Sequence, residues 1–359
     1  MKVRFFVLFL ATGLLLCGLA GCGGRELHQR LLIQAIGIDT GDQGVAVTVR
    51  AASTGQEAGD QLYTCQGATV PEALSSLTLS TGREPFYAHC SLVVLGRSCG
   101  EARLSEFLDF FLRGNTVRPT AQVLLSTGTA SQILSAKRDS ELLPVGDLTA
   151  PSQAGRNTGM AFSVDLLELV NSALRPGSSP VLPLVEPGGD APQLAGSAYF
   201  RDLRLAGTFT LEETRGLLAL RGWLESGELA LEREIFGTVT LGLTQGKTQR
   251  ALTWEGDLPQ LQVRCQVRAE LLSLDGPASQ DLYSQLEQAL AQALEEEMSA
   301  ALEKALADGC DVLGLGNLVS QRRPQAWREL APRWETLLSQ CGFQLEAQAQ
   351  VQPREEEGL

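Results

Sequence analysis

The first half of the chain alternates short apolar runs with turn-forming segments. Residues 31–38 are mostly apolar and residues 45–51 alternate apolar with polar side chains, while the sequence DTGDQG between them has turn chemistry. This pattern predicts a β-hairpin. Further along, the apolar segments CSLVVLG (90–96) and AQVLLS (121–126) predict two buried strands.

A helix is predicted between those two strands. Within residues 101–113 the apolar positions recur at spacings of three and four residues, which places them on one helical face: Leu104, Phe107, Leu108 and Phe111. Because parallel strands need a crossover connection, the order strand, helix, strand favours an α/β arrangement here. The segment SVDLLELVNSAL (163–174) predicts another short amphipathic helix.

Longer strands are predicted in the second half. Residues 261–271 and 343–351 alternate apolar with polar side chains, which is typical of an antiparallel sheet with one solvent-facing side. We expect residues 197–205 and 236–244 to form strands of the same sheet. This half is therefore predicted to be built on an antiparallel sheet.

A long helix is predicted over residues 281–308, where leucine or methionine recurs every four residues. Its start would be capped by Ser279 or Asp281, and Gly309 would end it. We expect this helix to lie across the C-terminal sheet and to form the core with it.

The N-terminus has the three-part pattern of a bacterial secretory signal. Two basic residues precede an apolar run from Phe5 to Leu19, which leads into the sequence Leu-Ala-Gly-Cys. This sequence matches the lipobox, in which the cysteine is acylated, carries palmitate and becomes the first residue after cleavage. We therefore predict a signal peptide at residues 1–21 and lipid attachment at Cys22. The alternatives are an uncleaved membrane helix and a disulfide-bonded cysteine.

The remaining chain is long enough for more than one domain. Residues 176–190 contain four prolines, which is typical of a boundary between domains. We predict an N-terminal α/β region at 22–190, with one or two subdomains, and a C-terminal α+β domain at 196–352.

Charge argues against one class of partner. The chain has a formal net charge of −13, and loss of residues 1–21 would leave 27 basic and 42 acidic residues. Such a surface repels phosphate backbones, so we expect no nucleic-acid partner.

Motifs for cofactors and metals are weak. Outside the signal and the lipobox there are six cysteines, and the sequence leaves open whether they are buried thiols or disulfides: Cys65, Cys90, Cys99, Cys265, Cys310 and Cys341. With no CxxC pair and only two histidines, a zinc site has few ligands. The segment VLGLGN (312–317) lacks the third glycine of a dinucleotide motif and follows a predicted helix, so we interpret it as a turn. We expect neither metal nor cofactor.

Catalytic constellations are equally weak. His89 and Cys90 are adjacent on an extended segment, so their side chains point to opposite faces and cannot form a nucleophile–base pair. The run of Glu295, Glu296 and Glu297 is best explained as a solvated helix face. Arg113 and Arg118 are compatible with an anion site or with a structural ion pair. The sequence therefore predicts a protein that is not an enzyme.

Five segments, in order behind the lipobox, resemble the Ger(x)C family of spore germination lipoproteins. The first is RELHQRLLIQAIGIDTGD, and the second contains the family's His, strand, helix and Asp-x-x-x-Arg pattern at His89, Asp109, Arg113 and Arg118. The third is the helix and proline segment SVDLLELVNSALRPGSSPVLPLVEP. The last two contain the following matching residues: Gly207, Glu213, Thr214, Arg215, Gly216 and Trp223, then Gly314, Gly316 and Trp334. Gly23 and Gly24 depart from the tryptophan that is common after the lipidated cysteine.

This resemblance implies an α+β, multidomain, mixed α/β lipoprotein. It also implies the C subunit of a nutrient germinant receptor, attached through acylated Cys22 to the outer face of the inner spore membrane. Its partners would be the membrane-spanning A and B subunits, and its function would be nutrient-triggered germination without enzymatic activity. The matched Glu213, Thr214 and Arg215 are candidates for the surface that meets the partners, but we expect them chiefly to maintain the fold.

Two other function classes fit parts of the sequence. A substrate-binding lipoprotein of a transporter would share the lipid anchor, but it should have two doubly wound lobes around a cleft. A secreted hydrolase would need a nucleophile such as Cys90 or Cys99.

Overall fold

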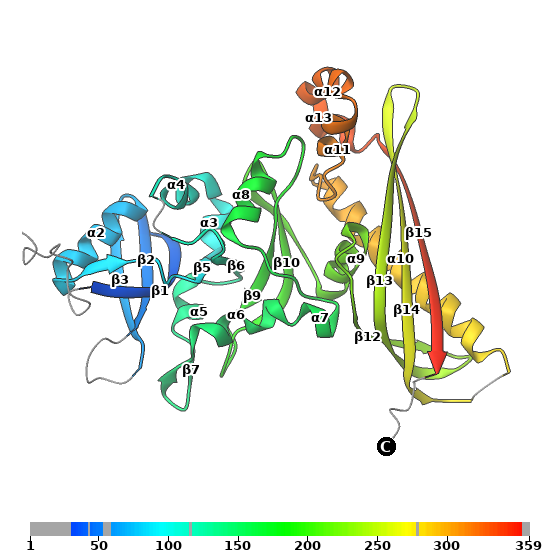
Figure 1. The fold of residues 1–359 in the computed structure, drawn as a ribbon, viewed down its shortest axis with the longest axis horizontal. Helices are drawn as coiled ribbons and strands as arrows, with labels where there is room; N and C mark the ends of the chain where they lie inside the picture. Colours follow the sequence, from blue (N-terminus) through cyan, green and yellow to red (C-terminus); the bar gives the residue numbers. More distant parts are fainter. Residues whose placement is uncertain (1–29, 42–43, 53–58, 115–116, 278–279, 354–359) are drawn as a thin grey trace, which may run out of the picture.

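Two β-sheets lie side by side in the computed structural model, which describes residues 30–353 apart from 42–43, 53–58, 115–116 and 278–279 (Figure 1). The first sheet occupies the N-terminal part of the chain, and the second, with one long helix, occupies the C-terminal part. No helix in the described ranges is both long and apolar enough to cross a membrane.

The first sheet has nine strands, of which four central ones, β1, β5, β6 and β9, run parallel to one another. Antiparallel strands extend it on both sides. The strands are β1 (Arg30–Gly41), β2 (Gly44–Ala52), β3 (Gln61–Gly67), β4 (Glu84–Phe86), β5 (Leu92–Leu95), β6 (Gln122–Ser126), β9 (Val181–Glu186), β10 (Gln193–Arg201) and β11 (Arg204–Phe209). The predicted hairpin is confirmed as β1 and β2, and the two predicted strands at 90–96 and 121–126 are confirmed as the parallel pair β5 and β6.

Helices cover both faces of the first sheet. They are α2 (Val70–Thr81), α3 (Arg97–Glu101), α4 (Leu104–Gly114), α5 (Ala130–Leu134), α6 (Val145–Gln153) and α8 (Leu166–Leu174), with a small hairpin of β7 (Lys137–Arg138) and β8 (Glu141–Leu142). The short helix α7 (Gly155–Thr158) follows α6 and contacts the second sheet instead. Alternate residues of β5 face two different apolar clusters, one with α2 and α4 and the other with α5 and α6. Burial on both faces explains why β5 is continuously apolar.

The second sheet has four strands in sequence order: β12 (Gly227–Arg233), β13 (Gly237–Glu255), β14 (Leu258–Asp275) and β15 (Gly342–Pro353). The first two pairings are antiparallel, as predicted, but β14 and β15 are parallel. This sheet is therefore mixed, because a helical crossover between β14 and β15 returns the chain in the same direction.

One predicted strand belongs to the other sheet. Residues 197–205 form most of β10 and the start of β11, which pair with each other in the first sheet, so their assignment to the C-terminal sheet was wrong. The predicted strand at 236–244 is confirmed as part of β13. The proline-rich segment contains β9, which pairs with β10. The first sheet thus continues past Asp190 into β10 and β11. The division into domains at 22–190 and 196–352 stays a prediction.

The long helix is α10 (Leu282–Ala307), which lies along one face of the second sheet (Figure 1). Its 26 residues bury a stripe that contains the predicted leucines and methionine, except Leu306, which is half-buried. Asp281 occupies the N-cap position without a side-chain cap bond, and Ser279 lies outside the described residues. Short helices follow before β15: α11 (Leu315–Arg322), α12 (Pro324–Leu330), η2 (Ala331–Arg333) and α13 (Trp334–Leu338).

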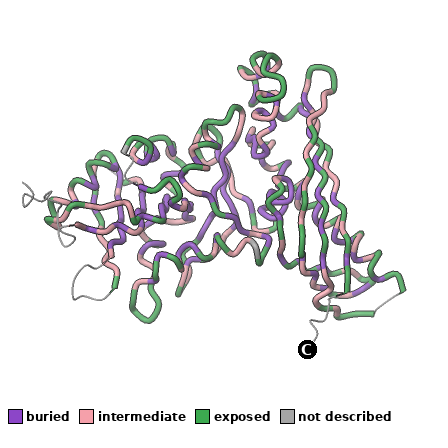
Figure 2. Tube along the Cα trace, viewed as in Figure 1, coloured by how far each residue is buried: buried purple, intermediate pink, exposed green. Residues whose placement is uncertain are grey.

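The helix α9 (Leu211–Arg221) joins the two sheets. It follows β11 and packs between β10 and α10 (Figure 1), and its residues from Thr214 to Leu220 are all buried. Figure 2 shows buried residues on both sides of this junction. One apolar cluster runs from the first sheet through α9 to the second sheet, so the two parts share a core.

Candidate functional site

The predicted lipid-attachment residue, Cys22, lies outside the described residues, as do Arg25 and Glu26. Its acylation therefore stays a prediction. The residues Gly37, Ile38 and Asp39 of the first matching segment, RELHQRLLIQAIGIDTGD, lie near the end of β1. Asp39 accepts hydrogen bonds from the backbone N–H groups of Ala130 and Ser131, at 2.7 and 3.1 Å, and so caps α5. This pattern has a structural role.

His89 and Cys90 do not form a catalytic pair. Cys90 is fully buried and burial raises the pKa of its thiol to about 12, whereas His89 is exposed beside the ring of Phe86. All six cysteines outside the signal and the lipobox are buried free thiols, which decides between the two states that the sequence left open. The described residues contain no group of His, Cys, Asp or Glu side chains arranged to hold a metal ion.

Arg113 forms an exposed ion pair with Asp109 one turn earlier in α4, at 2.6 Å. This outcome agrees with the structural alternative for Arg113. Arg118 is exposed in the loop before β6. The two arginines therefore do not line a shared buried site.

The Glu-Thr-Arg-Gly segment of the resemblance forms the interface between α9 and α10. Arg215 is 5% exposed and pairs through two nitrogens with the carboxylate of Glu297, which is 14% exposed. The prediction that Glu297 lies on a solvated face was therefore wrong, because α9 covers that side of α10. Glu213 accepts hydrogen bonds from Lys304 of α10 and caps α9 with Thr210. These contacts support the expected role in maintaining the fold.

Glu295 also departs from the solvated-face prediction. Its carboxylate accepts a hydrogen bond of 2.8 Å from the backbone N–H of Ala347 in β15. Of the three consecutive glutamates only Glu296 is exposed. The run therefore holds α10 to β15 on one side and to α9 on the other.

The loop between α10 and α11 is fixed by a buried carboxylate. Asp311, 4% exposed, accepts hydrogen bonds from the backbone N–H groups of Leu315 and Gly316 at 2.9 and 2.7 Å. Burial raises the pKa of Asp311 to about 6, although these hydrogen bonds lower it. The segment VLGLGN is a turn only as far as Gly314, which has a φ of 67° and is the N-cap of α11. Gly316 then lies in the helix.

Two arginines hold the same loop from the other side. Arg221, the last residue of α9, donates to the carbonyl oxygen of Val312 through Nε and one terminal nitrogen. Arg250 of β13 donates to the carbonyl oxygen of Leu313. Hence residues of α9 and β13 set the path of the chain between α10 and α11.

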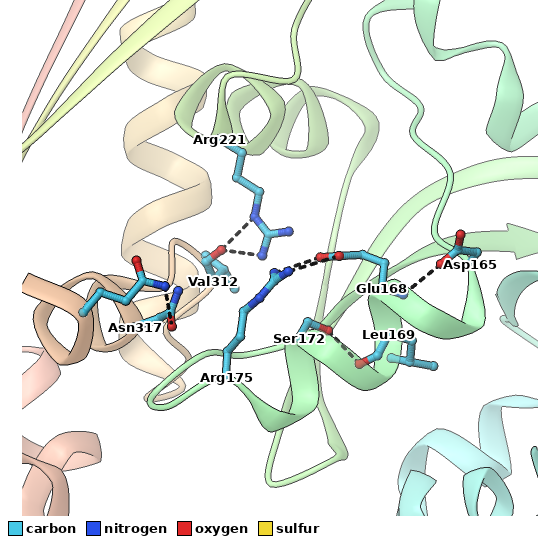
Figure 3. Close-up of polar contacts among 9 residues, drawn as sticks. Asp165, Glu168, Leu169, Ser172, Arg175, Arg221, Val312 and Asn317 are labelled. Carbon is cyan, nitrogen blue, oxygen red and sulfur yellow. Dashed lines mark hydrogen bonds and ion pairs between the residues drawn. The ribbon is translucent and has the colours of Figure 1, made fainter. Parts of the chain in front are cut away.

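A third arginine approaches from α8. Arg175 follows the last residue of α8 and makes two hydrogen bonds to Glu168, at 2.9 and 3.2 Å. In Figure 3 this ion pair faces Arg221 and Val312 across the junction. The three arginines and Glu168 line a cavity of about 150 Å³, which we call the junction pocket.

Sequence reasoning missed the junction pocket. Arg175, Arg221 and Arg250 are far apart in the chain, and each has an ordinary local setting: a helix C-cap, a last helical turn and a long strand. Only the packing of α8, α9, β13 and the loop before α11 brings them together. Trp223, which the resemblance did match, is among the residues that line this pocket.

The match to known proteins extends over nearly the whole chain. A family model described as the spore germination protein N-terminal domain matches residues 23–187. A second, described as spore germination B3/GerAC-like, C-terminal, matches residues 195–353. The spore germination protein KC of Bacillus subtilis (strain 168) is 22% identical over 362 residues, which cover 88% of each chain.

The fold is also found in a solved relative. A crystal structure of the GerBC protein superposes with a TM-score of 0.58 at 16% sequence identity, covering 88% of this chain and 96% of that chain. The mixed α/β, multidomain fold class is thereby confirmed. The second sheet, with its single long helix, is unlike the second doubly wound lobe that a transporter-binding protein would have. The chain belongs to the Ger(x)C family of spore germination proteins.

Proposed function

We propose that this chain is the lipid-anchored C subunit of a spore germinant receptor. It is attached through acylated Cys22 to the outer face of the inner spore membrane, and it acts with membrane-spanning A and B subunits in nutrient-triggered germination. One observation carries the proposal. The two family models match in order over residues 23–187 and 195–353, and the first match begins directly after the lipobox cysteine.

The lipid gives this role a physical basis. Each buried methylene of an acyl chain contributes about 0.8 kcal/mol to membrane attachment, so two or three chains hold a protein stably. Attachment raises the effective concentration of the chain beside its partner subunits. The acidic surface, with a formal charge of −15 after loss of residues 1–21, repels anionic headgroups and keeps the folded part off the bilayer.

A role without catalysis agrees with the chemistry of the described residues. Their cysteine thiols are buried, and burial raises the pKa of Cys90 and of Cys99 to about 12, so neither provides a thiolate at neutral pH. The buried ion pair Arg215–Glu297 lies between α9 and α10 and holds these two helices together. The function we propose is therefore one of assembly and signalling.

The experiment compares two cysteines of the N-terminal segment. Cells that express the tagged chain are fed labelled palmitate, and the membrane fraction is purified with its associated proteins. We expect labelling, and co-purification of the A and B subunits, for the wild type and for Cys17→Ala, since Cys17 lies within the apolar run. Both should be lost in Cys22→Ala. Labelling of Cys22→Ala, or its unchanged retention in the membrane, would contradict the proposal.

A further inference from the structure

The junction pocket gathers positive charge in an acidic protein. Its charged lining consists of three arginines and one carboxylate: Arg175, Arg221, Arg250 and Glu168. The chain as a whole carries a net charge of −13. A local excess of two positive charges in a small cavity is therefore a feature of this place and not of the surface in general.

The three guanidinium groups retain unused donors. Together they have fifteen N–H groups, and they make five hydrogen bonds to residues that the structure describes. Nε of Arg250 is buried and has no hydrogen-bond partner in the described part of the chain. A buried donor without an acceptor is unfavourable, so the pocket favours a ligand that accepts hydrogen bonds.

The mutual repulsion of the three arginines also favours a ligand, and specifically an anion. Burial, and then the charge of Arg250, lower the pKa of Arg221 to about 10, while Arg175 adds a smaller effect of the same sign. The two acidic groups nearby are already engaged. Glu168 pairs with Arg175, and Asp311 directs both carboxylate oxygens at the first turn of α11. An additional anion would relieve this repulsion.

We propose that the junction pocket binds a small carboxylate. A guanidinium fork matches the geometry of a carboxylate, as Arg175 and Glu168 already show within the pocket. Trp223 and Leu318 add apolar walls that fit a short carbon chain and offer nothing to inorganic phosphate. Trp223 is 41% exposed, and the guanidinium carbon of Arg221 lies 4.8 Å from the centroid of its ring, so the ring is available for such contact. The inference stands independently of the proposed receptor role.

The test is isothermal titration calorimetry on the full chain in detergent, with succinate, acetate and inorganic phosphate as probes at constant ionic strength. We expect saturable binding of succinate below about 10 mM. Arg250→Gln and Arg175→Gln should each weaken it about tenfold or more, because a hydrogen bond between charged groups is lost. Arg264→Gln is the matched control, since that arginine forms an exposed pair with Glu346 on the open face of the second sheet.

The Arg175→Gln variant separates a loss of binding from a loss of folding. Arg250 also holds the carbonyl oxygen of Leu313, whereas the Arg175 side chain is 43% exposed and its only described partner is Glu168. Loss of binding in Arg175→Gln with an unchanged unfolding temperature would support the pocket. Absence of saturable succinate binding in the wild type, unchanged binding in both pocket variants, or tighter binding of phosphate than of succinate would each overturn the inference.

Discussion

The buried ion pair between α9 and α10 offers a quantitative test of how the two halves are held together. Arg215 and Glu297 are 5% and 14% exposed, and two nitrogens of the guanidinium contact the carboxylate. Replacing Arg215 by methionine keeps most of the apolar stem but leaves a carboxylate in the interface. We expect Arg215→Met to lower the free energy of unfolding by about 3–5 kcal/mol, the usual cost of an uncompensated buried charge.

Removal of both charges should restore much of the loss. In the double variant Arg215→Met/Glu297→Leu no charge remains buried, so we expect a stability within about 2 kcal/mol of the wild type. Burial already raises the pKa of Glu297, although Arg215 lowers it. In the Arg215→Met variant, Glu297 should therefore take up a proton more readily. The loss of unfolding free energy relative to the wild type should then be smaller at pH 5 than at pH 8.

The assay is urea unfolding followed by circular dichroism, with Arg264→Met as control. Its exposed pair with Glu346 is screened by solvent and should contribute little to stability. The reasoning would be refuted if Arg215→Met cost no more than Arg264→Met. It would also be refuted if the double variant lost as much stability as the sum of the two single variants.

Three further predictions follow from buried groups. Burial raises the pKa of Asp311 from 3.8 to about 6, so the folded state binds this proton more tightly than the unfolded state. Loss of the proton should therefore lower the free energy of unfolding progressively as pH rises from 4 to 6, by up to about 3 kcal/mol. Asp311→Asn should lose more stability relative to the wild type at pH 4 than at pH 7, as measured by urea unfolding; equal losses would contradict this. A Cβ on Gly216 would lie 2.1 Å from a backbone oxygen of α10, whereas one on Gly146 would meet nothing within 4 Å. Gly216→Ala should therefore lower the melting temperature and Gly146→Ala should not, and equal melting temperatures would show that α9 and α10 are less close. Finally, a thiol reagent should label the native protein only slowly, and complete labelling should require unfolding. Rapid labelling of the native protein would contradict the burial of these six residues: Cys65, Cys90, Cys99, Cys265, Cys310 and Cys341.

Local patterns predicted those elements whose sequence signal reflects burial of one face. The alternation in β14 and the four-residue repeat in α10 are direct consequences of packing a strand and a helix against one core. The hairpin of β1 and β2 was equally clear because its turn chemistry is local. The α+β class followed from these elements together.

Strand pairing and long-range contacts had no local signal. The alternation in β15 is the same whether it runs parallel or antiparallel to β14, since the period depends on burial and not on direction. Glu297 belongs to a run of three glutamates, which is typical of a solvated helix face. Only the packing of α9 against α10 shows that its side chain is buried. The arginines of the junction pocket are likewise brought together by tertiary packing alone.

The receptor role is tested most directly by germination of spores in which this chain is absent or carries Cys22→Ala. Loss of refractility is followed after addition of each nutrient class, with a non-nutrient trigger and Cys17→Ala spores as controls. The account predicts that the deletion and Cys22→Ala spores fail with at least one nutrient class, while both controls germinate normally. Normal germination of the deletion spores with every nutrient would contradict it.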